Sequence, residues 1–197
     1  MSEAVSPLRI ETVVKLGGGV FADAVRFNAA LAAIAAAALS RRLLIVPGGG
    51  PFADAVRDVD RRLGLSDTAA HWMAVLAMDQ YAHLIASRLA GAVVVAEPNG
   101  VAAALDARTI PVLAPYRWLR EADPLPHSWD VTSDSIAAWV AGRLGARRLV
   151  LVKPAGVQGS DETVDPYFAR ALPRSVTSLV VTADRIDALR STLTDEA

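Results

Sequence analysis

The stretch Val13–Gly19, which reads VVKLGGG, decides the fold. Residues 10–16 are rich in β-branched side chains, have the length of a strand and end at a turn signal. The three glycines let the backbone approach a ligand closely and direct its N–H groups toward it. The alanine-rich stretch from about Ala22 to Ser40 then predicts a helix. A strand, a glycine loop and a helix N-terminus in this order are suited to binding phosphate.

Lys15 is one of only two lysines in the chain. The other is Lys153, and the remaining 18 of the 20 basic residues are arginines. Both lysines end an apolar run beside a glycine turn. Lysine carries a compact point charge, which suits the charge spread over the oxygens of a phosphoryl group in transfer better than a planar guanidinium does. Two solvated lysines at strand ends are the alternative interpretation.

The composition is typical of a globular protein with a large core. The chain has 197 residues, of which 53% are hydrophobic, and its mean hydropathy is +0.33. A net charge of −1 gives no electrostatic argument for a nucleic acid or membrane partner. The absence of cysteine excludes disulfides and thiolate metal sites, and it fits a cytoplasmic enzyme. We expect a single domain over residues 1–197 with a small-molecule substrate.

No targeting or membrane segment is predicted. The N-terminus carries Glu3 and lacks a basic region followed by an apolar run, so it does not resemble a signal peptide. The longest apolar run, Ala29–Leu39, is too short to span a bilayer and is interpreted as a helix packed on a sheet.

The same arrangement of strand, glycine loop and helix occurs a second time. Leu43–Val46 predicts a strand, Pro47–Phe52 reads PGGGPF, and a helical pattern continues to Leu63. Pro51 suits the first turn of that helix. One such loop is a weak indication, but two of the same design predict two anion-binding backbones that face one cleft.

A long helix is predicted from Ser66 or Asp67 to about Leu89. His71, Val75, Met78 and Ala82 share one of its faces, and Asp79 lies near that face. One interpretation is a substrate-lining face with His71 and Asp79 as polar contacts. The other is a core helix that contains a hydrogen-bonded histidine.

The rest of the chain alternates strands with helices. Strands are expected at residues 93–95, 109–113, 149–152 and 178–182, and helices at 98–107, 136–144, from 165 and at 183–193. Residues 115–129 are expected to form an ordered loop over the sheet, and residues 158–164 a polar loop. Arg117 in the first loop is interpreted either as an anion contact or as a surface residue. The alternation predicts a mainly parallel sheet covered on both faces.

Asp134 lies in the stretch Asp130–Ser135, which reads DVTSDS and leads into a helix. Thr132 or Ser133 can cap that helix, and an acid in its first turn is favourable for the helix dipole alone. Ligand loops of a parallel sheet belong at the carboxyl ends of its strands. Lys15, Gly48, Asp134 and Lys153 are all expected at that edge or just beyond it.

Together these motifs resemble the amino acid kinase superfamily, which includes acetylglutamate kinases and bacterial uridylate kinases. The motifs lie in the family's order between residues 12 and 170: VKLGG (14–18), PGGG (47–50), TSDS (132–135), KPAG (153–156) and DP (165–166). The resemblance implies an α/β fold, a three-layer αβα sandwich with a mainly parallel central sheet. It also implies ATP in one half of a cleft and the phosphate acceptor in the other, with Mg²⁺ and a homo-oligomer built from dimers.

The resemblance also implies roles for single residues. Lys15 would stabilise the transferring phosphoryl group, and Asp134 would orient Lys15 and Lys153 as the other catalytic residues. The implied phosphate or nucleotide contacts are Gly17, Gly18, Gly19, Gly156, Asp165 and Pro166. The implied acceptor contacts are Gly48, Gly49, Gly50, His71, Asp79 and Thr132. No metal-ligating side chain is implied.

The chain departs from acetylglutamate kinases at Lys153 and from uridylate kinases at Ala155. Acetylglutamate kinases have an aspartate at the position of Lys153, and uridylate kinases follow the lysine with an acid where this chain has Ala155. A looser likeness, carried by residues 47–54, 66–80 and 128–134, is to the branch around the archaeal [5-(aminomethyl)furan-3-yl]methyl phosphate kinases. That likeness implies an acceptor with an alcohol-borne phosphate and a nearby amine, with His71 and Asp79 as the residues that face the amine.

The main hypothesis is an ATP- and Mg²⁺-dependent kinase that phosphorylates a phosphate- or carboxylate-bearing small molecule. One candidate acceptor is an aminomethylfuran phosphate of methanofuran-type cofactor biosynthesis. No strong base is needed because such an acceptor is already ionised, so positioning and charge neutralisation supply the rate. The alternative is a non-catalytic nucleotide- or oxyanion-binding protein on the same fold. A dinucleotide-dependent oxidoreductase is disfavoured because Ala22 occupies the third glycine position of its fingerprint.

Overall fold

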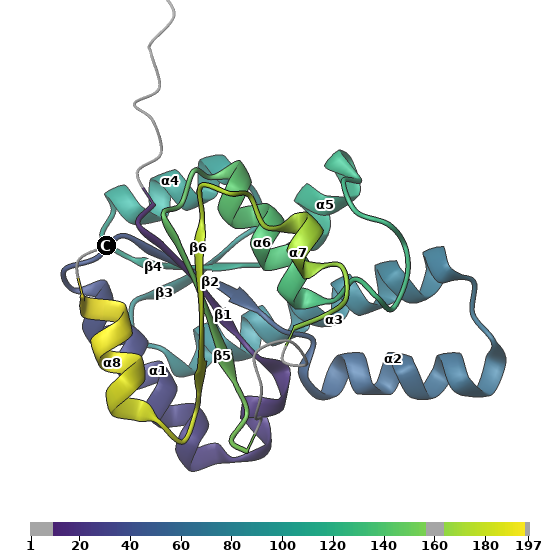
Figure 1. Cartoon of the computed structure of the whole chain (residues 1–197), viewed down its shortest axis with the longest axis horizontal. Coiled ribbons are helices and arrows are strands. Elements are labelled where there is room, and N and C mark those ends of the chain that lie inside the picture. Colours follow the sequence, from purple (N-terminus) through teal and green to yellow (C-terminus); the bar gives the residue numbers. More distant parts are fainter. Residues whose placement is uncertain (1–9, 157–163, 196–197) are drawn as a thin grey trace, which may run out of the picture.

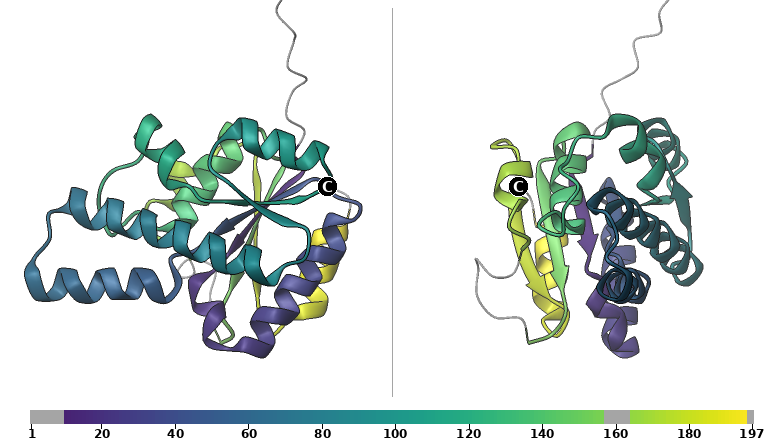
Figure 2. Two further views of the ribbon diagram at one scale, coloured as in Figure 1. Left: turned by 180° about the vertical axis from the view of Figure 1, so that it is seen from behind. Right: turned by 90° about the vertical axis from the view of Figure 1, so that its right-hand side faces the viewer.

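Strand β1 (Thr12–Leu16) is buried along its whole length and lies inside a parallel sheet. The computed structural model describes residues 10–156 and 164–195, and the expected loop at 158–164 lies almost entirely outside them. In the described residues the strand order is β3-β4-β2-β1-β5-β6, and helices cover both faces (Figures 1 and 2). The other strands are β2 (Leu43–Pro47), β3 (Ala92–Val95), β4 (Ile110–Leu113), β5 (Arg148–Lys153) and β6 (Thr177–Thr182).

The helices match the expected alternation with few exceptions. They are η1 (Gly18–Ala22, a 3₁₀ helix), α1 (Ala24–Ala38), α2 (Gly50–Leu63), α3 (Asp67–Arg88), α4 (Pro98–Asp106), α5 (Tyr116–Ala122), α6 (Ser133–Arg143), α7 (Phe168–Ala171) and α8 (Ile186–Thr194). The expected αβα sandwich is confirmed, and every pair of neighbouring strands in the described chain is parallel.

The register places both lysines at one edge of the sheet. Lys15 lies opposite Val46 of β2 and Leu151 of β5, and β5 continues to Lys153. Because β1, β2 and β5 run in the same direction, their carboxyl ends carry their loops to the same side. The strand order also changes direction at β1, which is where ligands bind in open α/β sheets.

Two hydrophobic cores lie on opposite faces of the sheet. Successive residues of a strand point to opposite faces, so Val13 packs with α4 and α6, whereas Val14 packs with α1 and α8. Helix α3 contributes to both cores, with Met78 in the first and Tyr81 in the second. This helix is therefore fixed against the sheet at its C-terminal end, while its N-terminal half extends beyond the sheet beside α2 (Figure 1).

One local expectation is confirmed to within two residues at each end, and another is wrong. The helix predicted from about Ala22 to Ser40 is α1 (Ala24–Ala38), which begins after Asp23 because residues 18–22 form η1. The side chain of Asp23 accepts hydrogen bonds from the N–H groups of Val25 and Arg26, both at 3.0 Å, and so starts the helix. Residues 115–129 are not loop throughout, since they contain α5, whose Trp118 and Leu119 are buried.

Helices α2 and α3 form a hairpin that projects from the sheet (Figures 1 and 2). Gly64, at φ +65°, ends α2, and the Ser66 hydroxyl accepts from the Ala69 N–H to start α3. The hairpin provides one wall of the cavity described below. Among the described residues, none of the helices combines the length and the apolar character needed to span a membrane.

Candidate functional site

The two lysines converge on one carboxylate. Lys15 Nζ lies 2.8 Å from Asp134 Oδ1, and Lys153 Nζ lies 2.5 Å from Asp134 Oδ2. The lysines lie at the carboxyl ends of neighbouring strands, Lys15 one residue before the end of β1 and Lys153 at the end of β5, and Asp134 lies in the first turn of α6. All three side chains are almost inaccessible, with 4%, 8% and 3% of the surface of Lys15, Lys153 and Asp134 exposed. The interpretation of two solvated lysines at strand ends is therefore wrong.

The charges of this group depend on one another. Burial alone would raise the pKa of Asp134, but the two ammonium groups outweigh burial and hold that pKa below its ordinary value. Burial lowers the pKa of Lys153, and the neighbouring Lys15 lowers it further. Two ammonium groups and one carboxylate leave the buried set with an excess positive charge, which suits an anion.

Asp165 fixes the helix that carries Asp134. One of its oxygens accepts from the N–H and hydroxyl of Thr132, at 2.9 and 2.8 Å, and from the N–H of Ser135 at 3.0 Å. Its other oxygen accepts from the Ser135 hydroxyl. Asp165 is itself buried. These bonds engage both oxygens within the fold, so the contribution of Asp165 to the site is to position α6.

The two glycine loops pack directly on one another. A Cβ atom at Gly18 would lie only 2.2 Å from the backbone nitrogen of Gly50, and one at Gly48 would lie 2.5 Å from that of Gly18. The Gly48 N–H donates to Leu16, and the Gly17 N–H to Val152, which joins the loops to the sheet. Gly18 and Gly50 begin η1 and α2, where backbone N–H groups have no partner within the helix.

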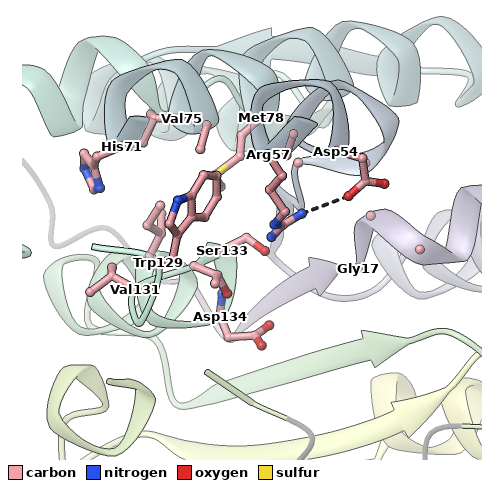
Figure 3. A pocket seen from close by; sticks show the side chains of 18 of the residues that line it. Gly17, Asp54, Arg57, His71, Val75, Met78, Trp129, Val131, Ser133 and Asp134 are labelled. Atoms are coloured by element: carbon pink, nitrogen blue, oxygen red, sulfur yellow. Dashed lines mark hydrogen bonds and ion pairs between the residues drawn. The ribbon is translucent and has the colours of Figure 1, made fainter. Parts of the chain in front are cut away.

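A cavity of about 320 Å³ opens between the lysines and the α2–α3 hairpin. Its floor is the lysine–aspartate group with the glycine loops, and its other walls come from α2, α3 and the segment before α6 (Figure 3). The predicted site residues that line it are Lys15, Gly17, Gly18, Gly19, Gly49, Gly50, His71, Thr132, Asp134 and Lys153. The structure therefore brings most of the predicted catalytic and acceptor residues together.

Other predicted residues lie elsewhere. Gly48, Asp79, Gly156, Asp165 and Pro166 are not among the residues that line this cavity. The Asp79 carboxylate accepts from the Tyr116 N–H at 3.0 Å and so holds the start of α5, and burial raises the pKa of Asp79. The expectation that Asp79 faces the acceptor is not supported by this placement.

Arg117 is a surface residue. Its side chain is 74% exposed and pairs with Glu97 at 2.6 Å. The alternative interpretation of Arg117 as an anion contact finds no support in its position.

Sequence reasoning missed several residues of the cavity wall. Arg57 and Asp54 of α2 pair at 2.9 Å and both line the cavity (Figure 3). Trp129, assigned to a loop over the sheet, also lines it, as does Asp67 at the start of α3. The one signal for Trp129 is its position directly before the stretch that carries Asp134.

His71 lies in the wall in its neutral form. Burial lowers its pKa to about 4, and the neighbouring His127 contributes to that shift. The two rings are stacked with centroids 4.4 Å apart. His127 is held at both nitrogens, by the Thr68 hydroxyl at 3.0 Å and by Asp123 at 2.9 Å. His71, Val75 and Met78 of α3 line the cavity, in agreement with the substrate-lining interpretation of this face. Val75 and Met78 also belong to one hydrophobic core and Ala82 to the other, in agreement with the core-helix interpretation.

Comparison with known proteins agrees with this geometry. The family model described as the amino acid kinase family matches residues 11–163 of the chain. The chain belongs to the amino acid kinase family. The match runs from β1 past Lys153 and includes both glycine loops and Asp134.

Within this family, one similar protein is [5-(aminomethyl)furan-3-yl]methyl phosphate kinase of Methanocaldococcus jannaschii. The two are 29% identical over 140 residues, which are 71% of this chain and 63% of the relative. The chain therefore spans less than two thirds of the length of that curated relative.

Solved structures show the same fold at low sequence identity. Uridylate kinase from Archaeoglobus fulgidus has a TM-score of 0.67 at 16% identity, with coverage of 95% of this chain and 97% of the other. UMP kinase from Ureaplasma parvum has a TM-score of 0.68 at 15% identity, with coverage of 96% and 97%. N-acetylglutamate synthase from Neisseria gonorrhoeae, complexed with coenzyme A and N-acetyl-glutamate, has a TM-score of 0.59 at 17% identity, with coverage of 96% and 58%.

Proposed function

We propose that this chain is an ATP-dependent small-molecule kinase that transfers the γ-phosphoryl group to a phosphate- or carboxylate-bearing acceptor. The observation that carries the proposal is the buried Lys15–Asp134–Lys153 group at the floor of a cavity, beside two glycine loops in contact. Membership of the amino acid kinase family supports the same reading.

In the proposed reaction an oxygen of the acceptor attacks the γ-phosphorus, and the bond from that phosphorus to the β–γ bridging oxygen breaks. ADP leaves with the electron pair of that bond, and the acceptor gains one phosphoryl group. Lys15 and Lys153 would balance the charge on the transferring group, and Asp134 would hold both ammonium groups in place. Gly18, Gly19 and Gly50 would direct backbone N–H groups toward phosphate oxygens.

The residues present fit a nucleotide whose magnesium is carried by its phosphates. In the described parts of the chain, no group of three or more His, Asp or Glu side chains is arranged to hold a metal ion. Both oxygens of Asp134 are taken by lysines. Mg²⁺ commonly keeps several waters and binds mainly through substrate phosphates, and there it would neutralise phosphate charge.

For the acceptor we infer a small phosphate ester, with an aminomethylfuran phosphate as the first candidate. The relative from Methanocaldococcus jannaschii is named for such a substrate and aligns over most of this chain. Within the cavity, His71, Thr132, Gly49 and Gly50 are the predicted acceptor contacts.

A non-catalytic binding protein on this fold is the alternative. The same fold occurs in N-acetylglutamate synthase from Neisseria gonorrhoeae, so the fold alone does not decide the chemistry. The buried lysine pair favours the kinase. A binding protein needs cations only beside the bound phosphates, whereas a kinase also needs cations that stabilise the phosphoryl group during its transfer.

Incubation with ATP, Mg²⁺ and a panel of acceptors tests the proposal. The panel contains [5-(aminomethyl)furan-3-yl]methyl phosphate, UMP and N-acetylglutamate, and mass spectrometry detects any product heavier by one phosphoryl group. Lys15→Ala is the matched variant and should lower turnover by a factor on the order of a hundred to a thousand, while ATP affinity changes less. ATP binding without transfer to any acceptor would favour the binding protein.

We also infer a single domain over residues 1–197, because β1 to β6 share one sheet. A cytoplasmic location is part of the same proposal, since the co-substrate is ATP. We infer a homo-oligomer built from dimers as well. Its support is apolar exposure on α1 and the edge strand β6, where Val25 is 79% exposed and Val180 is 43% exposed.

A further inference from the structure

One face of α2 lines the cavity from its floor outward. Gly50, Ala53, Asp54 and Arg57 all line the cavity, and their spacing places them on the same side of the helix. Arg57 lies roughly 10 Å along α2 from Gly50. Its side chain points into the cavity (Figure 3). Arg57 therefore brings a positive charge to the wall that begins at a predicted acceptor contact, away from the strands that carry the lysines.

The guanidinium of Arg57 is held by two neighbours. Its Nη1 donates to Asp54 at 2.9 Å, and its central carbon lies over the Trp129 ring, 5.0 Å from the centroid. The indole N–H of Trp129 donates to Asp60 at 2.7 Å, so the ring is fixed as well. Within the described residues, Nε and Nη2 of Arg57 have no hydrogen-bond partner. The edge of the guanidinium that carries these two nitrogens is thus available to a ligand.

Asp54 leaves this edge suited to an anion. Its side chain is 74% exposed, so water screens its charge, and it occupies only one of the three guanidinium nitrogens. Arginine binds oxyanions through two parallel N–H donors, and it can stack on an aromatic ring while its planar fork makes these bonds. Phosphate and carboxylate groups match the free edge of Arg57.

The proposed reaction needs a cation on the side of the acceptor. It brings two oxyanions together, the γ-phosphate and the acceptor, and like charges a few ångströms apart repel each other. The lysine–aspartate group supplies one net positive charge at the floor. Among the described residues that line the cavity, Arg57 is the one lysine or arginine that is not paired with Asp134.

We propose that Arg57 binds the oxyanion of the acceptor through Nε and Nη2, while Lys15 and Lys153 hold the phosphoryl group in transfer. The inference rests on the proposed function, to whose acceptor it assigns a binding residue. Trp129 is a positioning residue, because its ring orients the guanidinium.

This contact favours one class of acceptor. A phosphate monoester has three terminal oxygens, so two can bind Arg57 while the third attacks the γ-phosphorus and forms the new P–O bond. The bond to the β–γ bridging oxygen breaks, and ADP leaves with its electron pair. A carboxylate would have to release one of its two bound oxygens, and an alcohol has no further oxygen to bind. Arg57 therefore selects a phosphate monoester, and the product is a diphosphate.

Titration with inorganic phosphate tests the inference without turnover. Calorimetry measures phosphate binding to the protein saturated with Mg²⁺ and a non-hydrolysable ATP analogue, and the titration is repeated without the analogue so that the result does not depend on nucleotide binding. Arg57→Met retains an unbranched side chain but removes the charge. It should weaken phosphate binding by about tenfold or more, the scale of hydrogen bonds to a charged group.

The matched control is Arg61→Met. Arg61 lies one turn further along α2 and pairs with Asp58 at 3.2 Å, as Arg57 pairs with Asp54, but Arg61 does not line the cavity. This variant should keep the phosphate affinity of the wild-type protein. The inference is overturned if Arg57→Met binds phosphate as tightly as the wild-type protein does, or if Arg61→Met loses as much affinity as Arg57→Met.

Two further variants test the positioning role of Trp129. Trp129→Leu removes the ring beneath the guanidinium and should weaken phosphate binding, although less than Arg57→Met does. Trp129→Phe keeps a ring there and should restore most of the affinity. Equal phosphate affinity in the two variants would remove the positioning role.

Steady-state rates separate this inference from the proposed function. With an acceptor that the protein phosphorylates, Arg57→Met should raise the KM for the acceptor by about tenfold or more and leave the KM for ATP near the wild-type value. A raised KM for ATP alone would place Arg57 on the nucleotide and overturn the inference. Phosphate binding that depends on Arg57, without transfer to any acceptor, would support the oxyanion site and count against the kinase alone.

Discussion

At the scale of single residues, Asp134 neutralises two ammonium groups that are both buried. Asp134→Asn removes the only charge that offsets Lys15 and Lys153 within this group, and breaking a buried ion pair costs about 3–5 kcal/mol. We expect turnover to fall at least a hundredfold and the melting temperature to drop. Steady-state rates and thermal unfolding check this prediction.

The neighbouring Asp130→Asn is the control, because Asp130 is an exposed carboxylate in the same stretch of sequence. It should leave both quantities near wild type. Normal turnover in Asp134→Asn with only lower stability would reduce Asp134 to a favourable charge at a helix end.

His71 predicts a pH dependence of stability. Its folded pKa is about 4, against an ordinary value of about 6.5 in the unfolded chain. Between these values the unfolded state binds a proton that the folded state does not, so stability falls as the pH is lowered from about 6.5 to about 4. The loss is at most on the order of 3 kcal/mol.

The His71→Gln variant cannot take up this proton, so its free energy of unfolding should depend less on pH between about 6.5 and about 4. Urea unfolding at half-unit pH steps measures it, with His127 and Asp123 present in both proteins. If the free energy of unfolding depends on pH equally in the variant and the wild-type protein, then His71 titrates alike in the folded and unfolded states.

The residue types at the floor of the site could be predicted because each stands in a short motif. Lys15 and Lys153 follow apolar runs, and Asp134 follows capping residues. Trp129 and Arg57 could not be found in this way. Their role depends on α2 meeting the segment before α6, which is a tertiary contact with no local sequence signal.

At the scale of secondary-structure elements, α6 depends on Asp165. In Asp165→Ala four donors of Thr132 and Ser135 lose their partner, and each unsatisfied buried group costs about 1–3 kcal/mol. We expect a lower free energy of unfolding and a lower kcat, with little change in the KM for ATP. The reason is that Asp134 moves with the start of α6.

Asp23→Ala is the control, since the Asp23 carboxylate also accepts from N–H groups at the start of a helix, α1, but lies outside the site. It should cost about 0.5–2 kcal/mol in stability and leave kcat unchanged. Equal effects of the two variants on kcat would remove the positioning role of Asp165.

The contact between the glycine loops gives a second prediction at this scale. Gly18→Ala places a methyl group 2.2 Å from the Gly50 nitrogen, where neither backbone can yield easily. We expect a loss of about 3 kcal/mol, the upper range for overpacking, together with weaker ATP binding. Gly64→Ala is less informative as a control because of its positive φ, so Ala35→Gly in α1 serves to test stability loss alone.

Chemical denaturation and nucleotide titration measure both effects. Wild-type ATP affinity in Gly18→Ala would mean that this loop contact does not shape the nucleotide site.

The order of strands and helices was predictable from buried runs and glycine turns. Helix α5 was not, because Pro115 and the polar residues around Tyr116 resemble a loop, and the helix is stabilised by burying Trp118 and by the bond from Asp79.

At the scale of the whole molecule, the parallel sheet brings distant segments into one site. Lys15 and Lys153 are far apart in sequence, yet β1 and β5 are neighbours in register. The alternation of elements predicted such a sheet and therefore the convergence of the two lysines. It could not predict how the α2–α3 hairpin closes over them, since that depends on the length and packing of both helices.

The central claim is that the lysine pair transfers a phosphoryl group rather than merely binding one. The most direct test is the rate of phosphoryl transfer in Lys15→Arg and Lys153→Arg, measured beside ATP affinity. A guanidinium is wider than an ammonium and cannot fit the same buried contacts with Asp134 beside the glycine loops. We predict that both variants fold, bind ATP and lose most phosphoryl transfer, Lys15→Arg the more severely. Wild-type transfer rates in both variants would contradict the account.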